Sequence, residues 1–186
     1  GISMLAVLAG ALVYYNVIHK DPVAAGSQTV VDNQGKEITI GGEVGNQCPD
    51  YDMPLYFEDG TIKPSNGRGK VTVINFWYIY CSACVHELKT EFPDLHKNYG
   101  DDVEIIVVHS YEEFGEDIPK WIEKNLPMDA GFVHCRDGAD DPFFKHLGGT
   151  SAWPITVILD EEGIIQYKMI GSTTYEEMSA VIDSIL

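Results

Sequence analysis

Two long apolar runs in the middle of the chain predict neighbouring strands of a buried sheet. Val71–Trp77 and Val103–Val108 are almost uninterrupted series of apolar and β-branched residues, the pattern of strands covered on both faces. The segment from Cys81 to about Tyr99 lies between them and is predicted to be a helix. A strand, a helix and a second strand in this order predict a right-handed βαβ unit.

The rest of the second half predicts short elements and a closing amphipathic helix. Ile155–Leu159 and Ile164–Lys168 flank a turn sequence, which predicts a hairpin. Tyr175–Leu186 places four apolar residues on one helical face: Met178, Val181, Ile182 and Ile185. Before the hairpin we expect an insertion made of a helix at Ile118–Asn125, a strand at Gly131–His134 and one or two helical turns at Pro142–Leu147.

The N-terminal third carries weaker strand signals. One hairpin is predicted from Val30–Asp32 to Glu37–Ile40, and another within Tyr51–Ile62. The whole pattern predicts an α/β fold: a central mixed β-sheet flanked by helices, with an N-terminal hairpin extension and a central insertion. We divide the chain into an N-terminal segment at 1–19, a linker at 20–44 and one globular domain at 45–186.

The segment Ile2–Ile18 is almost entirely apolar. Its length lies at the short end of the range that spans a bilayer, about 17 to 25 residues. We predict a single membrane anchor with the domain on the extracytoplasmic side. A signal cleaved near the small residues Val23–Ala25, which would make the protein secreted, and a buried core helix are the alternatives.

Composition excludes some classes of function. The formal charge is −17, from 29 acidic against 12 basic residues, which argues against a surface that binds nucleic acid. Four cysteines are too few for a scaffold built on disulfides, and 45% hydrophobic residues provide an ordinary core. The cysteines are therefore expected to have a chemical role rather than to hold the fold together.

Cys81 and Cys84 form a Cys-Ser-Ala-Cys sequence where a predicted strand passes into a predicted helix. The first thiol lies at the helix N-terminus, where unpaired N–H groups and the helix dipole favour a thiolate. Two thiols at this spacing can form a disulfide with little backbone movement. The sequence therefore predicts a redox pair, in which Cys81 attacks a partner disulfide and Cys84, one turn inward, resolves the mixed disulfide.

Several stretches together resemble the extracytoplasmic ResA/TlpA-type thiol-disulfide oxidoreductases, grouped with the AhpC/TSA superfamily. They are Gly45–Tyr51, similar to G-x-x-A-P-D-F; Gly69–Trp77, similar to G-K-V-V-V-L-N-F-W; Cys81–Glu87, similar to C-x-x-C-x-x-E; and Gly148–Thr156, which contains Trp153-Pro154. The resemblance covers about 45–186 and implies a thioredoxin-like fold with a cis proline facing the disulfide. The chain departs from the family pattern at Cys48, Tyr80, Lys89 and Ser82-Ala83.

The resemblance also implies roles for residues around the redox pair. Asn75 stands where thioredoxins proper carry an acidic residue, and it cannot titrate. Glu87 lies one turn beyond Cys84, and the resemblance assigns proton exchange with the buried thiol to it. A cis Trp153-Pro154 bond would expose backbone groups for a substrate segment, and Tyr80 is expected to contact the partner.

Cys48 and Cys135 leave three alternatives open: a structural disulfide, two inert buried thiols, or a second redox relay.

The function predicted is thiol-disulfide exchange with proteins, with reduction as the preferred direction, and with no cofactor or resident metal. Relatives of this type receive electrons from a CcdA/DsbD-type membrane protein and serve cytochrome c maturation or secreted thiols. We expect a monomer, attached to the membrane by its N-terminal segment. A thioredoxin-fold copper chaperone and an AhpC/TSA-type thiol peroxidase are the alternatives, although Tyr78 stands where a peroxidase carries Thr or Ser.

Overall fold

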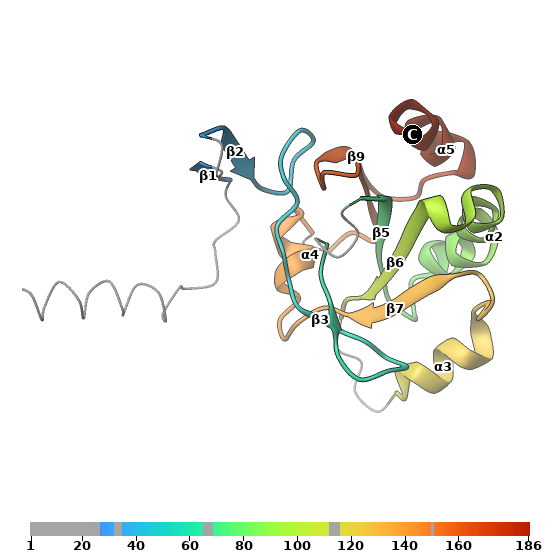
Figure 1. Cartoon of the computed structure of the whole chain (residues 1–186). Helices are drawn as coiled ribbons and strands as arrows, with labels where there is room; N and C mark the ends of the chain where they lie inside the picture. The colour runs from blue at the N-terminus through green and yellow to red at the C-terminus, as the bar shows by residue number, and fades with distance from the viewer. Residues whose placement is uncertain (1–26, 32–34, 65–68, 112–115, 150) are drawn as a thin grey trace, which may run out of the picture.

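A five-stranded mixed sheet is the frame of the part of the chain that the structure describes, residues 27–31, 35–64, 69–111, 116–149 and 151–186 of a computed structural model. Its strand order is β7-β6-β5-β8-β9 (Figure 1). Three strands are parallel: β5 (Val71–Trp77), β6 (Val103–His109) and β7 (Phe132–Arg136). The other two are antiparallel to their neighbours: β8 (Ile155–Leu159) and β9 (Ile165–Ile170).

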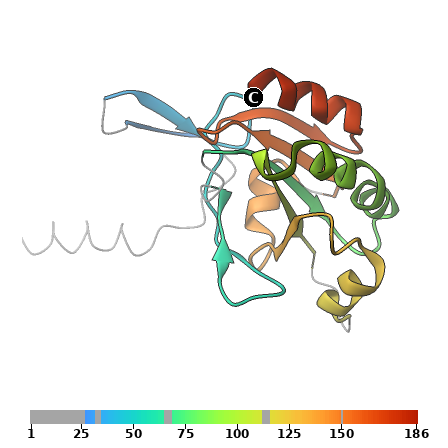
Figure 2. The ribbon, with the colours of Figure 1, turned by 45° about the vertical axis from the view of Figure 1, so that its right-hand side comes forward.

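Helices cover both faces of this sheet. On one face lie α2 (Ser82–Tyr99), α3 (Ile118–Asn125) and α5 (Tyr175–Ile185), and on the other lies α4 (Pro142–His146), as Figures 1 and 2 show. The central strand β5 divides its side chains between the two layers, because successive residues of a strand point to opposite faces. Val73 and Trp77 pack in the core under α2, whereas Ile74 and Phe76 pack in the core under α4.

The chain before β5 runs along both edges of the sheet. It begins with a hairpin of β1 (Gln28–Val31) and β2 (Glu37–Ile40). This hairpin, blue in Figure 2, extends away from the central sheet and its helices. Asn46 then accepts a backbone hydrogen bond from Ile165 at 2.9 Å beside β9. A second hairpin, β3 (Met53–Pro54) and β4 (Thr61–Ile62), follows, and near it the Tyr56 N–H donates to His134 of β7 at 3.0 Å. Both outer strands therefore have part of their backbone paired, which protects edges that would otherwise pair with other chains.

The predicted fold class and its elements are confirmed, and most boundaries differ by one or two residues. The insertion places β7 beside β6 as an outer parallel strand, and η2 (Gly100–Asp102) precedes β6. The predicted anchor or signal at 1–19 and part of the first hairpin's turn lie outside the described residues. Within the residues described, no helix is both long enough and apolar enough to cross a bilayer.

Candidate functional site

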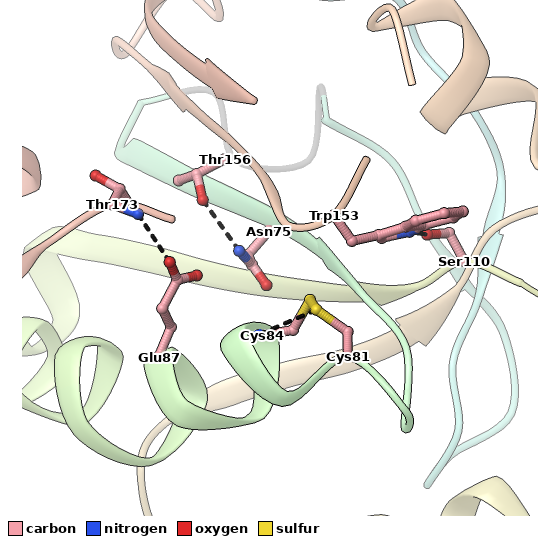
Figure 3. The surroundings of a disulfide bond; sticks show 8 residues. All are labelled: Asn75, Cys81, Cys84, Glu87, Ser110, Trp153, Thr156 and Thr173. Carbon is pink, nitrogen blue, oxygen red and sulfur yellow. Dashed lines mark hydrogen bonds between the residues drawn. A yellow bond between two sulfur atoms is a disulfide. The ribbon is translucent and has the colours of Figure 1, made fainter. Parts of the chain in front are cut away.

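Cys81 and Cys84 lie at the start of α2 and are joined by a disulfide (Figure 3). A turn follows β5, in which the Cys81 N–H donates to the Tyr78 carbonyl at 3.1 Å. Cys81 is the N-cap of α2, and its Sγ accepts the Cys84 N–H at 3.1 Å. This position stabilises a negative charge on Cys81, because the first N–H groups of a helix have no partner within the helix. Cys81 is 8% exposed and Cys84 is completely buried, so a partner reaches Cys81 first.

Glu87 is a buried carboxyl on α2, one turn beyond Cys84. Only 2% of it is exposed. Its Oε1 accepts the Thr173 N–H at 2.7 Å, and this bond and the nearby Ser172 side chain both act to lower the pKa of Glu87. Its Oε2 has no hydrogen-bond partner among the described residues. Burial outweighs these effects and raises the pKa of Glu87 to about 7. This carboxyl therefore changes protonation near neutral pH.

Asn75 supplies the second polar group behind the disulfide. It lies in β5, fully buried, and its Nδ2 donates to Thr156 Oγ1 at 3.0 Å. Its Oδ1 has no donor within the described part of the chain. Figure 3 shows both side chains in the space between the sheet and α2, with Asn75 extending from the sheet and Glu87 from the helix. Acceptor oxygens placed there suit a thiol that must lose a proton.

Trp153 and Pro154 form the loop that faces the disulfide. Their peptide bond is cis, as the resemblance implies. The Trp153 Nε1 donates to Ser110 Oγ at 2.8 Å, and the Phe144 ring stacks on the Trp153 ring with centroids 4.5 Å apart. Gly149 permits this stack, because a Cβ there would lie 2.5 Å from the Phe144 ring. Contacts from Ser110, directly after β6, and from Phe144 of α4 therefore hold the loop in place.

Tyr80 is the most exposed of the predicted site residues, at 67%. Its hydroxyl donates to Glu116 Oε1 at 3.0 Å, which joins the turn before Cys81 to the start of the α3 region. Trp77, in contrast, is fully buried beside His109 and belongs to the core. Figure 3 thus shows Cys81, Cys84, Glu87 and Trp153 around the N-terminal part of α2; Tyr80 directly precedes Cys81, and Pro154 is joined to Trp153 by the cis bond.

The other two cysteines are separate thiols. Cys48 and Cys135 are both free and buried, so the structural disulfide left open above is not found. Burial raises the pKa of both thiols, which keeps them protonated and unreactive at neutral pH. In the described ranges no three His, Cys, Asp or Glu side chains are grouped as a metal site requires.

Four residues that sequence reasoning missed support the site: Ser110, Phe144, Ser172 and Thr173. Thr173 meets Glu87 across a separation of 86 residues. Phe144 and Ser110 reach Trp153 from two different elements. No local pattern marks them, because an isolated Ser, Thr or Phe carries no signal of a contact made through the tertiary fold.

Comparisons with known proteins agree with this geometry. A family model described as the AhpC/TSA family matches residues 44–168. The thioredoxin-like protein YneN of Bacillus subtilis is 25% identical over 77% of this chain and 81% of its own length. The thiol:disulfide interchange protein DsbE of Pseudomonas fluorescens is 28% identical over 69% of this chain and 67% of its own length. The exposed lipoprotein thioredoxin of Streptococcus pneumoniae is 21% identical, with a TM-score of 0.60 over 73% of this chain and 99% of that chain. The fold is thus thioredoxin-like, as expected.

Proposed function

Because this chain belongs to the AhpC/TSA family and is a thioredoxin-like thiol-disulfide oxidoreductase of the ResA/TlpA type, we propose that it reduces disulfides of proteins outside the cytoplasm. The observation that carries the proposal is the pairing of an accessible and a buried cysteine with a buried carboxyl of raised pKa one turn away.

The reaction proceeds in two exchanges. The Cys81 thiolate attacks one sulfur of a partner disulfide, which breaks the partner's S–S bond and releases a first partner thiolate that takes up a proton. Cys84 then loses its proton and attacks Cys81 Sγ, which breaks the mixed disulfide and releases the second thiol. Two electrons pass to the partner, and the protein is left with the Cys81–Cys84 disulfide seen in the structure.

Glu87 receives the proton of Cys84 in the second exchange. A general base works best when its pKa is close to the working pH, and the pKa of Glu87 is about 7. Asn75 cannot take this proton, and its amide instead joins β5 to β8 through Thr156. The cis Pro154 loop beside Cys81 offers its backbone to the partner segment.

The location is inferred from the names of the relatives, and the electron source from the resemblance to the ResA/TlpA type. The relatives include proteins named DsbE and an exposed lipoprotein, which favours an extracytoplasmic domain. Attachment by the N-terminal segment is proposed from the apolar run at 2–18 alone. A dithiol donor in the membrane, of the CcdA/DsbD kind, would return the disulfide to two thiols. Cytochrome c maturation or the reduction of disulfides in secreted proteins is then the expected role, carried out by a monomer.

The reduction potential of the Cys81/Cys84 pair tests the direction. A value near or below about −250 mV supports a reductant, whereas a value near about −120 mV indicates an enzyme that installs disulfides. Cys84→Ser should accumulate a mixed disulfide with a protein substrate, and Cys81→Ser should form none. Normal turnover by Cys84→Ser would refute the resolving role. A protein with no reversible two-electron couple would instead favour the copper chaperone or the peroxidase.

A further inference from the structure

Three aromatic rings pack against one another, those of Tyr78, Tyr111 and Trp153, and Tyr80 lies between Tyr78 and Cys81 in the chain; we call these four residues the aromatic face. The ring centroids of Tyr78 lie 4.9 Å from Trp153 and 5.6 Å from Tyr111, and those of Tyr111 and Trp153 lie 6.1 Å apart. Tyr80 and Tyr111 are 67% and 52% exposed. Exposed aromatic rings grouped in this way mark a contact surface more often than they serve the core.

Tyr111 is held on this face in an unusual backbone conformation. Its φ is 120°, in the region that residues with a side chain rarely adopt. Its N–H donates to Asp141 Oδ1 at 3.0 Å, so the N-terminus of α4 helps to fix it. In this conformation the Tyr111 ring lies against Tyr78 and Trp153, and strained residues of this kind cluster at functional sites.

Two carboxylates lie at the rim of the aromatic face. Glu116 accepts the hydroxyl of Tyr80, and Asp141 accepts the backbone N–H of Tyr111, so two carboxylates touch two of the four aromatic residues. Arg136 ends β7 and lies opposite His109 of β6, two residues before Tyr111. A cation that approaches the face meets both ring faces and carboxylates, and each of these attracts it.

We propose that the aromatic face, with Glu116 and Asp141, selects partner segments that carry a lysine or arginine beside the cysteine to be reduced. This inference rests on the proposed function and names its class of substrate. The cation stacks on the exposed tyrosines, while the backbone on the other side of the cysteine lies against the Pro154 loop. Cation–π and surface ion-pair contributions together correspond to a preference of about three- to thirtyfold in kcat/KM.

Reduction of three peptides by the full-length protein tests the proposal. The peptides share one sequence and differ only in having Arg, Gln or Glu after a cysteine that is capped as a mixed disulfide with β-mercaptoethanol. The uncharged disulfide of β-mercaptoethanol serves as a separate substrate. We expect the order Arg, Gln, Glu in kcat/KM, and a smaller spread at high salt.

Two double variants distinguish the effect of the carboxylates at the aromatic face from the effect of the net charge of −17. Glu116→Gln with Asp141→Asn removes two charges while leaving an acceptor oxygen for each hydrogen bond. The Arg-to-Glu ratio should fall about threefold or more. Glu161→Gln with Glu162→Gln removes the same charge from exposed residues of the β8–β9 turn, at the far end of β8 from Pro154, and should leave the ratio unchanged. Tyr111→Ala should lower the Arg-to-Gln ratio independently.

The outcomes are distinct. Equal rates for the three peptides, or a ratio that falls equally in both double variants, would overturn the selectivity while the proposed function stands. Failure of the wild-type protein to reduce any peptide or the β-mercaptoethanol disulfide would overturn the proposed function itself. A ratio that depends on Glu116, Asp141 and Tyr111 supports the inference, because a general loss of activity changes rates without changing a ratio.

Discussion

Replacing Glu87 by glutamine should stabilise the oxidised protein above neutral pH and slow its thiol exchange. The carboxyl is 2% exposed, and its Oε2 has no partner in the described part of the chain. Glutamine has nearly the same shape and can still accept the Thr173 N–H through its amide oxygen. The substitution therefore removes a buried charge and leaves most of the packing intact.

The magnitude follows from the pKa of Glu87, which is about 7 in the folded protein against an ordinary 4.5. Each unit of pKa corresponds to about 1.4 kcal/mol, so ionising the buried group costs about 3 kcal/mol of unfolding free energy. The folded state holds the proton more tightly than the unfolded chain. The cost is therefore absent below pH 4.5, grows as the pH rises, and is complete once the pH exceeds about 7.

Urea unfolding of both proteins between pH 4 and pH 8.5 measures this difference. With a slope of about 2 kcal/mol/M, the midpoint of the variant should gain about 1.5 M relative to wild type between the two ends of the range. Glu123→Gln is the matched control, since Glu123 is an exposed helical glutamate, and its difference should not change with pH. A flat difference for Glu87→Gln would show that the pKa of this carboxyl is not raised. The kcat/KM profile of the variant should also lose its inflection near pH 7.

Three further substitutions test the framework of the site. Thr174→Ala removes the capping box of α5 and should lower the free energy of unfolding by about 1 kcal/mol, measured by calorimetry. An unchanged Tm would show that the Thr174 side chain does not stabilise the helix. Asp137→Ala removes the carboxylate that accepts the N–H groups of Gly138, Phe143 and Phe144. We expect the free energy of unfolding, measured in urea, to fall by about 2–4 kcal/mol; an unchanged value would mean that these hydrogen bonds do not stabilise the start of α4. Burial lowers the pKa of His109 to about 4, so the contribution of this neutral imidazole to stability is complete above pH 6.5 and is lost as the pH falls towards 4. His109→Gln should reduce this acid loss by up to about 3 kcal/mol, and an equal acid slope in both proteins would refute the assignment.

Local pattern was enough to predict the elements and the redox pair. The apolar runs at Val71–Trp77 and Val103–Val108 became adjacent parallel strands, because residues that are apolar on both faces are stable only inside a covered sheet. The spacing of Cys81 and Cys84 placed both thiols on the first turn of a helix, which depends only on neighbouring residues. These features need no knowledge of distant contacts.

Other features depended on contacts between distant parts of the chain. The sequence places Glu87 on the helix, but its pKa depends on burial and on the Thr173 N–H, which the β9–α5 connection brings to it. Cys48 and Cys135 stay apart although both are buried, and spacing alone left that choice open. Periodicity specifies which face of an element is apolar, whereas the packing of elements far apart in the chain decides which side chains meet. The sequence by itself therefore determined the elements and the thiol pair, and only the tertiary structure decided the protonation of the carboxyl behind that pair and the aromatic surface in front of it.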